Sequence, residues 1–182
     1  MIRLILTYGL ISGFAVIGVS VFVIANFGDG IDNGLGLWFG YLTMLVGLSS
    51  ILVAVKQHRD RALGGVIRFW PALGLGLAIA VVAGVAYCIG WEIYMAATHY
   101  TFMDKYADSV LAAKRAAGVS GAAYAKATAE MDAMRKSYAN PMMRLGMTFL
   151  EIFPVGVLVA LASAALLRNP RFLPARSRPL VA

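Results

Sequence analysis

Three ionisable side chains lie inside long apolar runs of this sequence: Glu92 in one run, and Arg144 and Glu151 in another. A charged group at mid-bilayer costs on the order of 2.5 kcal/mol or more, so such residues usually face protein or water. A carboxylate in that setting needs either a proton or a compensating cation, and Arg144 is the obvious cation. The three residues form a candidate intramembrane polar cluster.

Helical spacing supports this cluster. Arg144, Thr148 and Glu151 are separated by four and then three residues, which places them on one face of a helix. Counting outward from the middle of the connecting segment puts Glu92 close to the levels of Arg144 and Glu151, with an offset of roughly 5 to 6 Å. Two interpretations stay open. The cluster either fixes how two helices pack, or serves as a proton or cation pathway or a head-group binding site.

The runs that carry these residues are long enough to cross a membrane. Of the 182 residues, 60% are hydrophobic and 14% are charged, which is more apolar than an ordinary soluble domain. Four runs each reach the roughly 20 residues that a helix needs to span the hydrocarbon layer. They cover about 4–27, 35–55, 69–97 and 142–167. Because strand-like alternation is absent, we predict an all-α integral membrane four-helix bundle.

Lysine and arginine residues indicate the orientation of these spans, because their translocation is disfavoured. Segment 56–68 and the tail after 167 each hold four of them, whereas segment 28–34 holds two aspartates and no base. We therefore expect both termini in the cytoplasm. The net charge of +7 mostly reflects this topology, so we expect the lipid bilayer as a partner and no nucleic acid.

Segment 98–139, between the third and fourth spans, is polar, rich in alanine and helical in pattern, with a break at 118–121. It predicts an extracytoplasmic antiparallel helical hairpin, in which Asp104 and Arg135 come to the same height. Asn140 and Pro141 then resemble the N-cap and first residue of the fourth span. Two apolar stripes should face one another. They contain Phe102, Tyr106, Val110, Ala113 and Ala117 on the first arm, and Tyr124, Ala127, Met131, Met134 and Tyr138 on the second.

Catalytic and metal-binding motifs are absent from the sequence. There is no P-loop, nucleophile elbow or zinc-protease motif. His58 and His99 are expected on opposite sides of the membrane, so they cannot share a metal ion. The single cysteine, Cys88, lies inside an apolar run. We therefore expect no enzyme activity, no cofactor and no metal site.

Four blocks of sequence resemble the bacterial membrane family called domain of unknown function 4199, and the resemblance covers nearly the whole chain. It implies the same four-helix plan and a bacterial inner membrane, and it supplies no activity, cofactor or catalytic residue. Any task shared with the family would sit at the blocks that contain Lys56 and Glu151. The blocks are Leu6-Thr7-Tyr8-Gly9-Leu10-Ile11-Ser12-Gly13, Gly40-Tyr41-Leu42-Thr43-Met44, Lys56-Gln57-His58-Arg59-Asp60 with Gly64-Gly65, and Glu151-Ile152-Phe153-Pro154-Val155-Gly156.

Two functions from different classes are compatible with these features. The first is a non-catalytic interaction or assembly protein that associates with a second copy or with another membrane protein. Its candidate partner surface on the hairpin consists of Tyr124, Met131, Met134 and Tyr138. The second is a small oligomeric transporter or proton-coupled protein that uses Glu92 and Glu151.

Overall fold

A computed structural model describes residues 1–27 and 35–175, and these are entirely helical in their regular secondary structure. Four stretches are long and apolar enough to cross a membrane: Ile2–Asn26, Trp38–Ala62, Phe69–Ala97 and Pro141–Leu167. The predicted all-helical class is therefore confirmed, and so are four helices with the length and apolar composition that spanning a membrane requires. The described helices are α1 (Ile2–Phe27), α2 (Leu35–Leu48), α3 (Ser50–Ala62), α4 (Phe69–Ala97), α5 (Phe102–Ala116), α6 (Gly121–Ala139) and α7 (Pro141–Leu167).

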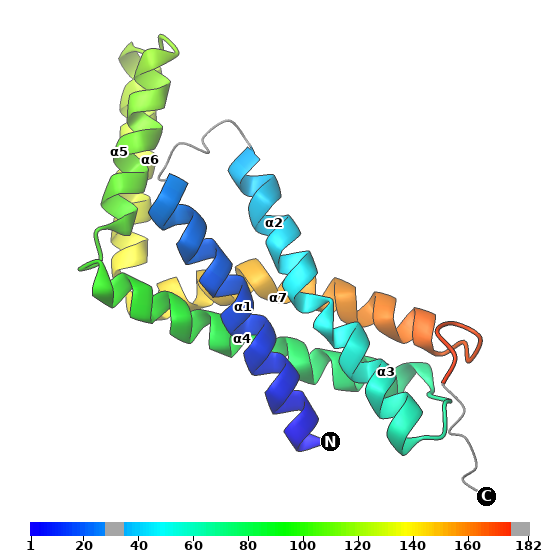
Figure 1. Cartoon of the computed structure of the whole chain (residues 1–182). Coiled ribbons are helices and arrows are strands. Elements are labelled where there is room, and N and C mark those ends of the chain that lie inside the picture. The colour runs from blue at the N-terminus through cyan, green and yellow to red at the C-terminus, as the bar shows by residue number, and fades with distance from the viewer. Residues whose placement is uncertain (28–34, 176–182) are drawn as a thin grey trace, which may run out of the picture.

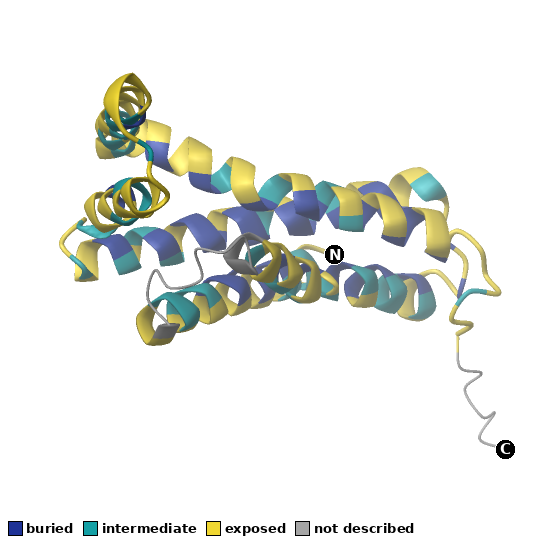
Figure 2. Cartoon of the chain, turned by 90° about the horizontal axis from the view of Figure 1, so that it is seen from above, coloured by how far each residue is buried: buried dark blue, intermediate teal, exposed yellow. Residues whose placement is uncertain are grey.

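Helix α4 is the most buried span and packs along both α1 and α7 (Figure 2). Glycines and alanines line these contacts and let the backbones approach closely. A methyl group placed on Gly13 would come within 2.6 Å of the Ala86 Cβ atom, and one on Gly76 within 2.8 Å of the Ala160 Cβ atom. The outward faces of the spans keep many large apolar side chains exposed, as a lipid-facing surface requires.

The second span consists of α2 and α3, which meet at Ser49. Its helix continues to Ala62, about two turns beyond Val55, where the apolar run ends in the sequence. The continuation is helical because Ile51, Val55 and Arg59 recur every four residues on one buried face. Gly65 then ends the helix with a positive φ of 94°, and its N–H donates to the carbonyl of Arg59 at 2.9 Å.

Helices α5 and α6 form an antiparallel hairpin that projects from the bundle where α4 ends and α7 begins (Figure 1). Gly118, with a φ of 80°, ends α5 in the left-handed conformation that the break in the sequence predicted. On α5 the buried residues are Met103 and Ala107, whereas Tyr106 is 40% exposed. The most buried residues of α5 thus lie one position after Phe102 and Tyr106 of the predicted stripe.

Helix α7 begins as its sequence predicted. The side chain of Asn140 accepts a hydrogen bond from the N–H of Met142 at 3.0 Å, and Pro141 is the first helical residue. Helix α1 begins and α7 ends at the same end of the bundle, opposite the hairpin (Figure 1). An even number of spans produces this arrangement.

Candidate functional site

Arg144 and Glu92 form a bidentate ion pair between α7 and α4. The Nε and Nη2 atoms of Arg144 donate to the two carboxylate oxygens of Glu92, at 2.5 and 2.9 Å. The Arg144 side chain is 6% exposed and that of Glu92 is 28% exposed. Two parallel charge-assisted hydrogen bonds of this kind fix orientation as well as distance. The pair therefore sets the register of α7 against α4.

Arg144 also holds the base of the hairpin. Its Nη1 donates to the backbone carbonyl of Tyr138 at 2.9 Å, and its guanidinium carbon lies 5.0 Å from the ring centre of Tyr100. The indole N–H of Trp91 donates to the Tyr138 hydroxyl at 2.6 Å. Burial raises the pKa of Tyr138, so this hydroxyl stays neutral. One arginine thus connects α4, α6 and α7.

Glu151 stands apart from this pair. It lies about 15 Å along α7 from Pro141, close to the middle of the helix. Its side chain is exposed in the single chain, although Thr148 and Val155 on the same face are buried. Among the described residues it has no hydrogen bond or ion pair. The structure therefore brings two of the three predicted cluster residues together and leaves the third as a separate mid-span carboxylate.

The arms of the hairpin are joined by a second arginine. Arg135 on α6 forms ion pairs with Asp104 at 3.2 Å and Asp108 at 2.6 Å on α5, and with Asp132 at 3.2 Å on its own helix. The hydrogen bond that Arg135 donates to Asp108 raises the pKa of the guanidinium. The ion pair predicted between Asp104 and Arg135 is confirmed, and it belongs to a larger acidic cluster.

The four residues of the predicted partner surface on α6 differ in how far they are exposed. Met134 is 41% exposed, whereas Met131 and Tyr138 are half-buried. Tyr124 is half-buried beneath Arg115, whose guanidinium carbon lies 5.0 Å from the ring centre. Of the four residues, Met134 is the one that presents most of its apolar surface outward.

Two cavities adjoin the pair formed by Arg144 and Glu92. A groove of about 870 Å³ runs between α4 and the start of α7, with apolar walls that include Ile89, Ile93 and Phe149 and with Glu92 as its charged residue. A smaller cavity of about 370 Å³ lies beside it, at the base of the hairpin, and is lined by both Arg135 and Arg144. Tyr100 lines both cavities and separates the apolar one from the polar one.

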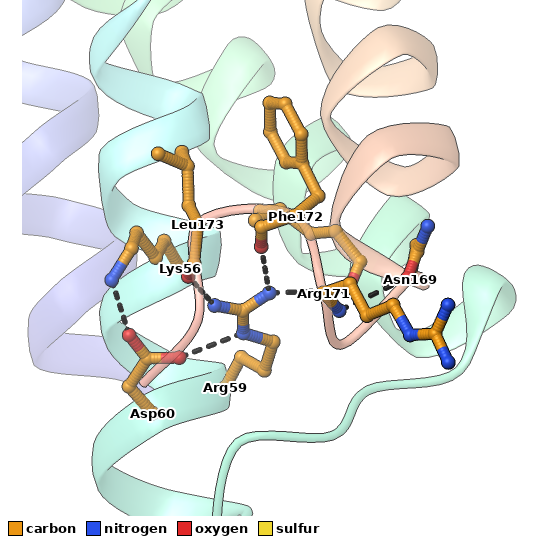
Figure 3. Close-up of polar contacts among 8 residues, drawn as sticks. Lys56, Arg59, Asp60, Asn169, Arg171, Phe172 and Leu173 are labelled. Carbon is orange, nitrogen blue, oxygen red and sulfur yellow. Dashed lines mark hydrogen bonds and ion pairs between the residues drawn. The ribbon is translucent and has the colours of Figure 1, made fainter. Parts of the chain in front are cut away.

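A third polar centre lies at the opposite end of the bundle, around the fully buried side chain of Arg59. Its Nε donates to Asp60 at 2.7 Å and its Nη1 donates to the carbonyl of Phe172 at 3.0 Å, while Nη2 donates to the carbonyl of Leu173 (Figure 3). Lys56 completes the cluster through an ion pair with Asp60. Through these hydrogen bonds Arg59 joins the segment after α7 to the end of α3.

Sequence reasoning assigned Arg59 only to a basic joint and missed this role. The usable signal was its position four residues after Val55 and eight after Ile51, on the face of the helix that is buried. Nearby, the Tyr8 hydroxyl donates to the side-chain oxygen of Gln57 at 2.9 Å. This contact joins two of the sequence blocks on which the family resemblance rests.

No group of three or more potential metal ligands gathers within residues 1–27 and 35–175. The polar centres instead consist of arginines held by carboxylates, backbone carbonyls and tyrosines. Guanidinium groups in this setting stay charged and donate hydrogen bonds. These guanidinium groups therefore join separate segments of the chain to one another.

Comparison with known proteins gives one match. The model of the family described as "Protein of unknown function (DUF4199)" matches residues 7–169, which include the first span from residue 7 onward, the other three spans and the hairpin. No curated protein and no solved structure matches the chain. The resemblance found in the sequence blocks is confirmed, and the chain belongs to the DUF4199 family.

Proposed function

We propose that this protein is a non-catalytic assembly protein of the bacterial inner membrane, which presents its helical hairpin to a second copy or to another membrane protein. The observation that carries the proposal is the fixation of the hairpin by Arg144, which binds Glu92 on α4 and the carbonyl of Tyr138 on α6. A plain connection between two spans needs only a few residues. A hairpin of two long helices fixed at its base offers a surface with a defined orientation.

To test this proposal, Met134 is replaced by a photo-crosslinking residue. The protein is crosslinked in its membrane and then extracted gently. We expect a crosslinked product of one defined mass at a fixed ratio to the chain, because Met134 is the most exposed apolar residue of the candidate surface. The matched control carries the same residue in place of Lys136, which is exposed on the opposite face of the same helix. Products of undefined mass, equal at both positions, would refute an assembly role for this surface.

The orientation of the chain is part of the same proposal. We propose that the hairpin is extracytoplasmic and that both termini are cytoplasmic, because the basic residues gather at the end opposite the hairpin. In a Cys88→Ala background, an impermeant thiol reagent applied from outside should label Ser120→Cys at the hairpin tip and spare Leu63→Cys after α3. Equal labelling of both, or the reverse pattern, would overturn the assignment.

A proton-coupled or transport function is the second candidate, and Glu151 is the observation that favours it. An exposed, unpaired carboxylate near mid-span suits a group that takes up and releases a proton or cation. Glu92 suits this role less well, because Arg144 neutralises it. Under this function Glu151→Gln should abolish a proton-dependent flux in liposomes while the crosslinked assembly persists. Under the assembly function the same change should leave the Met134 crosslink intact and no flux should be found in the unaltered protein.

A further inference from the structure

We infer that the groove between α4 and α7 is a binding site for one phospholipid with an amine head group, of the phosphatidylethanolamine class. The groove extends from Val85 to Ala96 along α4, which is about 16 Å at the helical rise. This length is close to half of the roughly 30 Å hydrocarbon layer, and so fits an acyl chain of one leaflet. Its volume of about 870 Å³ falls within the usual range for a ligand site.

The head group would lie in the smaller cavity at the base of the hairpin. Tyr100 lines both cavities, so a lipid with its acyl chain in the groove would place its head group beside Arg144. Three N–H groups of this guanidinium donate to Glu92 and to the carbonyl of Tyr138. Two of its five N–H groups have no acceptor among the described residues, and they can donate to a phosphate oxygen. Asp104 lines the same cavity and can accept from an ammonium group.

Charge complementarity favours an amine over an anionic head group. Arg135 and Arg144 line the small cavity, and they are paired with four carboxylates, from Glu92, Asp104, Asp108 and Asp132. With Lys105 and Lys136, which neighbour Asp104 and Arg135 in the sequence, the four carboxylates of this region are balanced by two guanidinium and two ammonium groups. A head group that carries both charges matches such a site, because its ammonium can meet Asp104 and its phosphate can meet Arg144, whereas an anionic head group offers Asp104 no cation.

Gly146 provides a direct way to fill the groove. It lines the groove on α7, and a Cβ atom added to it would meet no atom within 4 Å. Gly146→Leu should therefore fold normally and occupy space otherwise taken by an acyl chain. Gly18 on α1 also has open space around an added Cβ atom and does not line the groove, so Gly18→Leu is the matched control.

The test is native mass spectrometry of the delipidated chain, titrated with phosphatidylethanolamine and with phosphatidylglycerol that carry identical acyl chains. We expect one saturable phosphatidylethanolamine per chain. Gly146→Leu should weaken its binding about tenfold, equivalent to about 1.4 kcal/mol, because displacing two methylene groups costs about this much. Gly18→Leu should bind as the unaltered chain does. Circular dichroism of both variants verifies the fold, and Ile93→Trp replaces Gly146→Leu if that variant is misfolded.

Asp104→Asn probes the head group separately. Asp104 is 67% exposed, so its replacement leaves the fold intact. It should lower the preference for phosphatidylethanolamine over phosphatidylglycerol by about threefold, the size expected for an exposed charge pair. Equal binding of the two lipids by the unaltered chain, absence of saturation, or equal effects of Gly146→Leu and Gly18→Leu would each overturn the inference. None of these readouts involves a protein partner, so their failure leaves the assembly proposal standing.

Discussion

The guanidinium of Arg59 donates to the backbone carbonyl of Phe172 at 3.0 Å, across 113 residues of chain. This contact joins the end of the second span to the segment that follows the fourth. Since Arg59 is fully buried, its N–H groups need protein acceptors, and these are Asp60 together with the carbonyls of Phe172 and Leu173 after α7. The end of the bundle opposite the hairpin is therefore closed by a side chain rather than by apolar packing alone.

Arg59→Met should lower the free energy of unfolding by roughly 2 to 4 kcal/mol, because it leaves the carbonyls of Phe172 and Leu173 without their donor and leaves Asp60 with Lys56 alone. Unfolding in mixed micelles by increasing sodium dodecyl sulfate measures this change. The control is Arg61→Met, which removes an exposed arginine from the same helix and should have little effect. Equal stability of the two variants would contradict a closing role for Arg59.

The pair formed by Glu92 and Arg144 should show strong coupling in a double-mutant cycle. Glu92→Gln and Arg144→Met each leave one charge without its partner at the edge of the membrane, so each should destabilise the chain. The double variant should be less destabilised than the sum of the single variants, with a coupling energy of about 1 to 3 kcal/mol. Additive effects, measured by the same unfolding titration, would mean that the two residues act independently.

Gly13→Ala should force α1 away from α4. The added methyl group would lie 2.4 Å from the carbonyl oxygen of Ala83, which belongs to rigid helical backbone. Overpacking of this kind costs about 1 to 3 kcal/mol. Gly18→Ala, one and a half turns further along α1, meets open space and serves as the control. Thermal denaturation of the two variants in detergent should separate them, and identical midpoints would argue against close packing at Gly13.

Arg135→Gln should loosen the hairpin without unfolding the bundle. The three carboxylates that surround Arg135 would then repel one another across the two arms. Amide hydrogen exchange in α5 and α6 should rise about threefold, a modest effect because exposed charge pairs contribute little. Exchange in α4 should stay unchanged. High salt should reduce the difference from the unaltered chain, and a difference insensitive to salt would point to another cause.

The spans and the hairpin could be predicted because hydrophobic length and glycine breaks are local features of the sequence. The start of α7 at Asn140 and Pro141 is equally local, and it was predicted correctly. The pairing of Asp104 with Arg135 could be predicted by counting residues outward from the tip of the hairpin, because the two residues then lie at the same height on the two arms.

Contacts between residues far apart in the sequence could not be predicted from such local features. The role of Arg59 depends on carbonyls after α7, whose position is set only by the packing of complete spans. The most buried residues of α5, Met103 and Ala107, lie one position after the predicted stripe, because the rotation of a helix is set by the packing around it and not by its own sequence alone. Glu151 shares a helix face with Arg144 in the sequence, and yet its side chain lies exposed and away from the pair.

The hydrogen bonds between Arg59 and the segment after α7 can form only late in the synthesis of the chain. Its acceptors after α7 are synthesised on the order of 10 s later than the arginine itself, at ordinary rates of translation. During that interval the guanidinium must stay hydrated at the membrane surface, since the apolar layer offers it no acceptor. Arg59 therefore gains these acceptors only after the segment that follows α7 has been made, and the arrival of that segment fixes this end of the bundle.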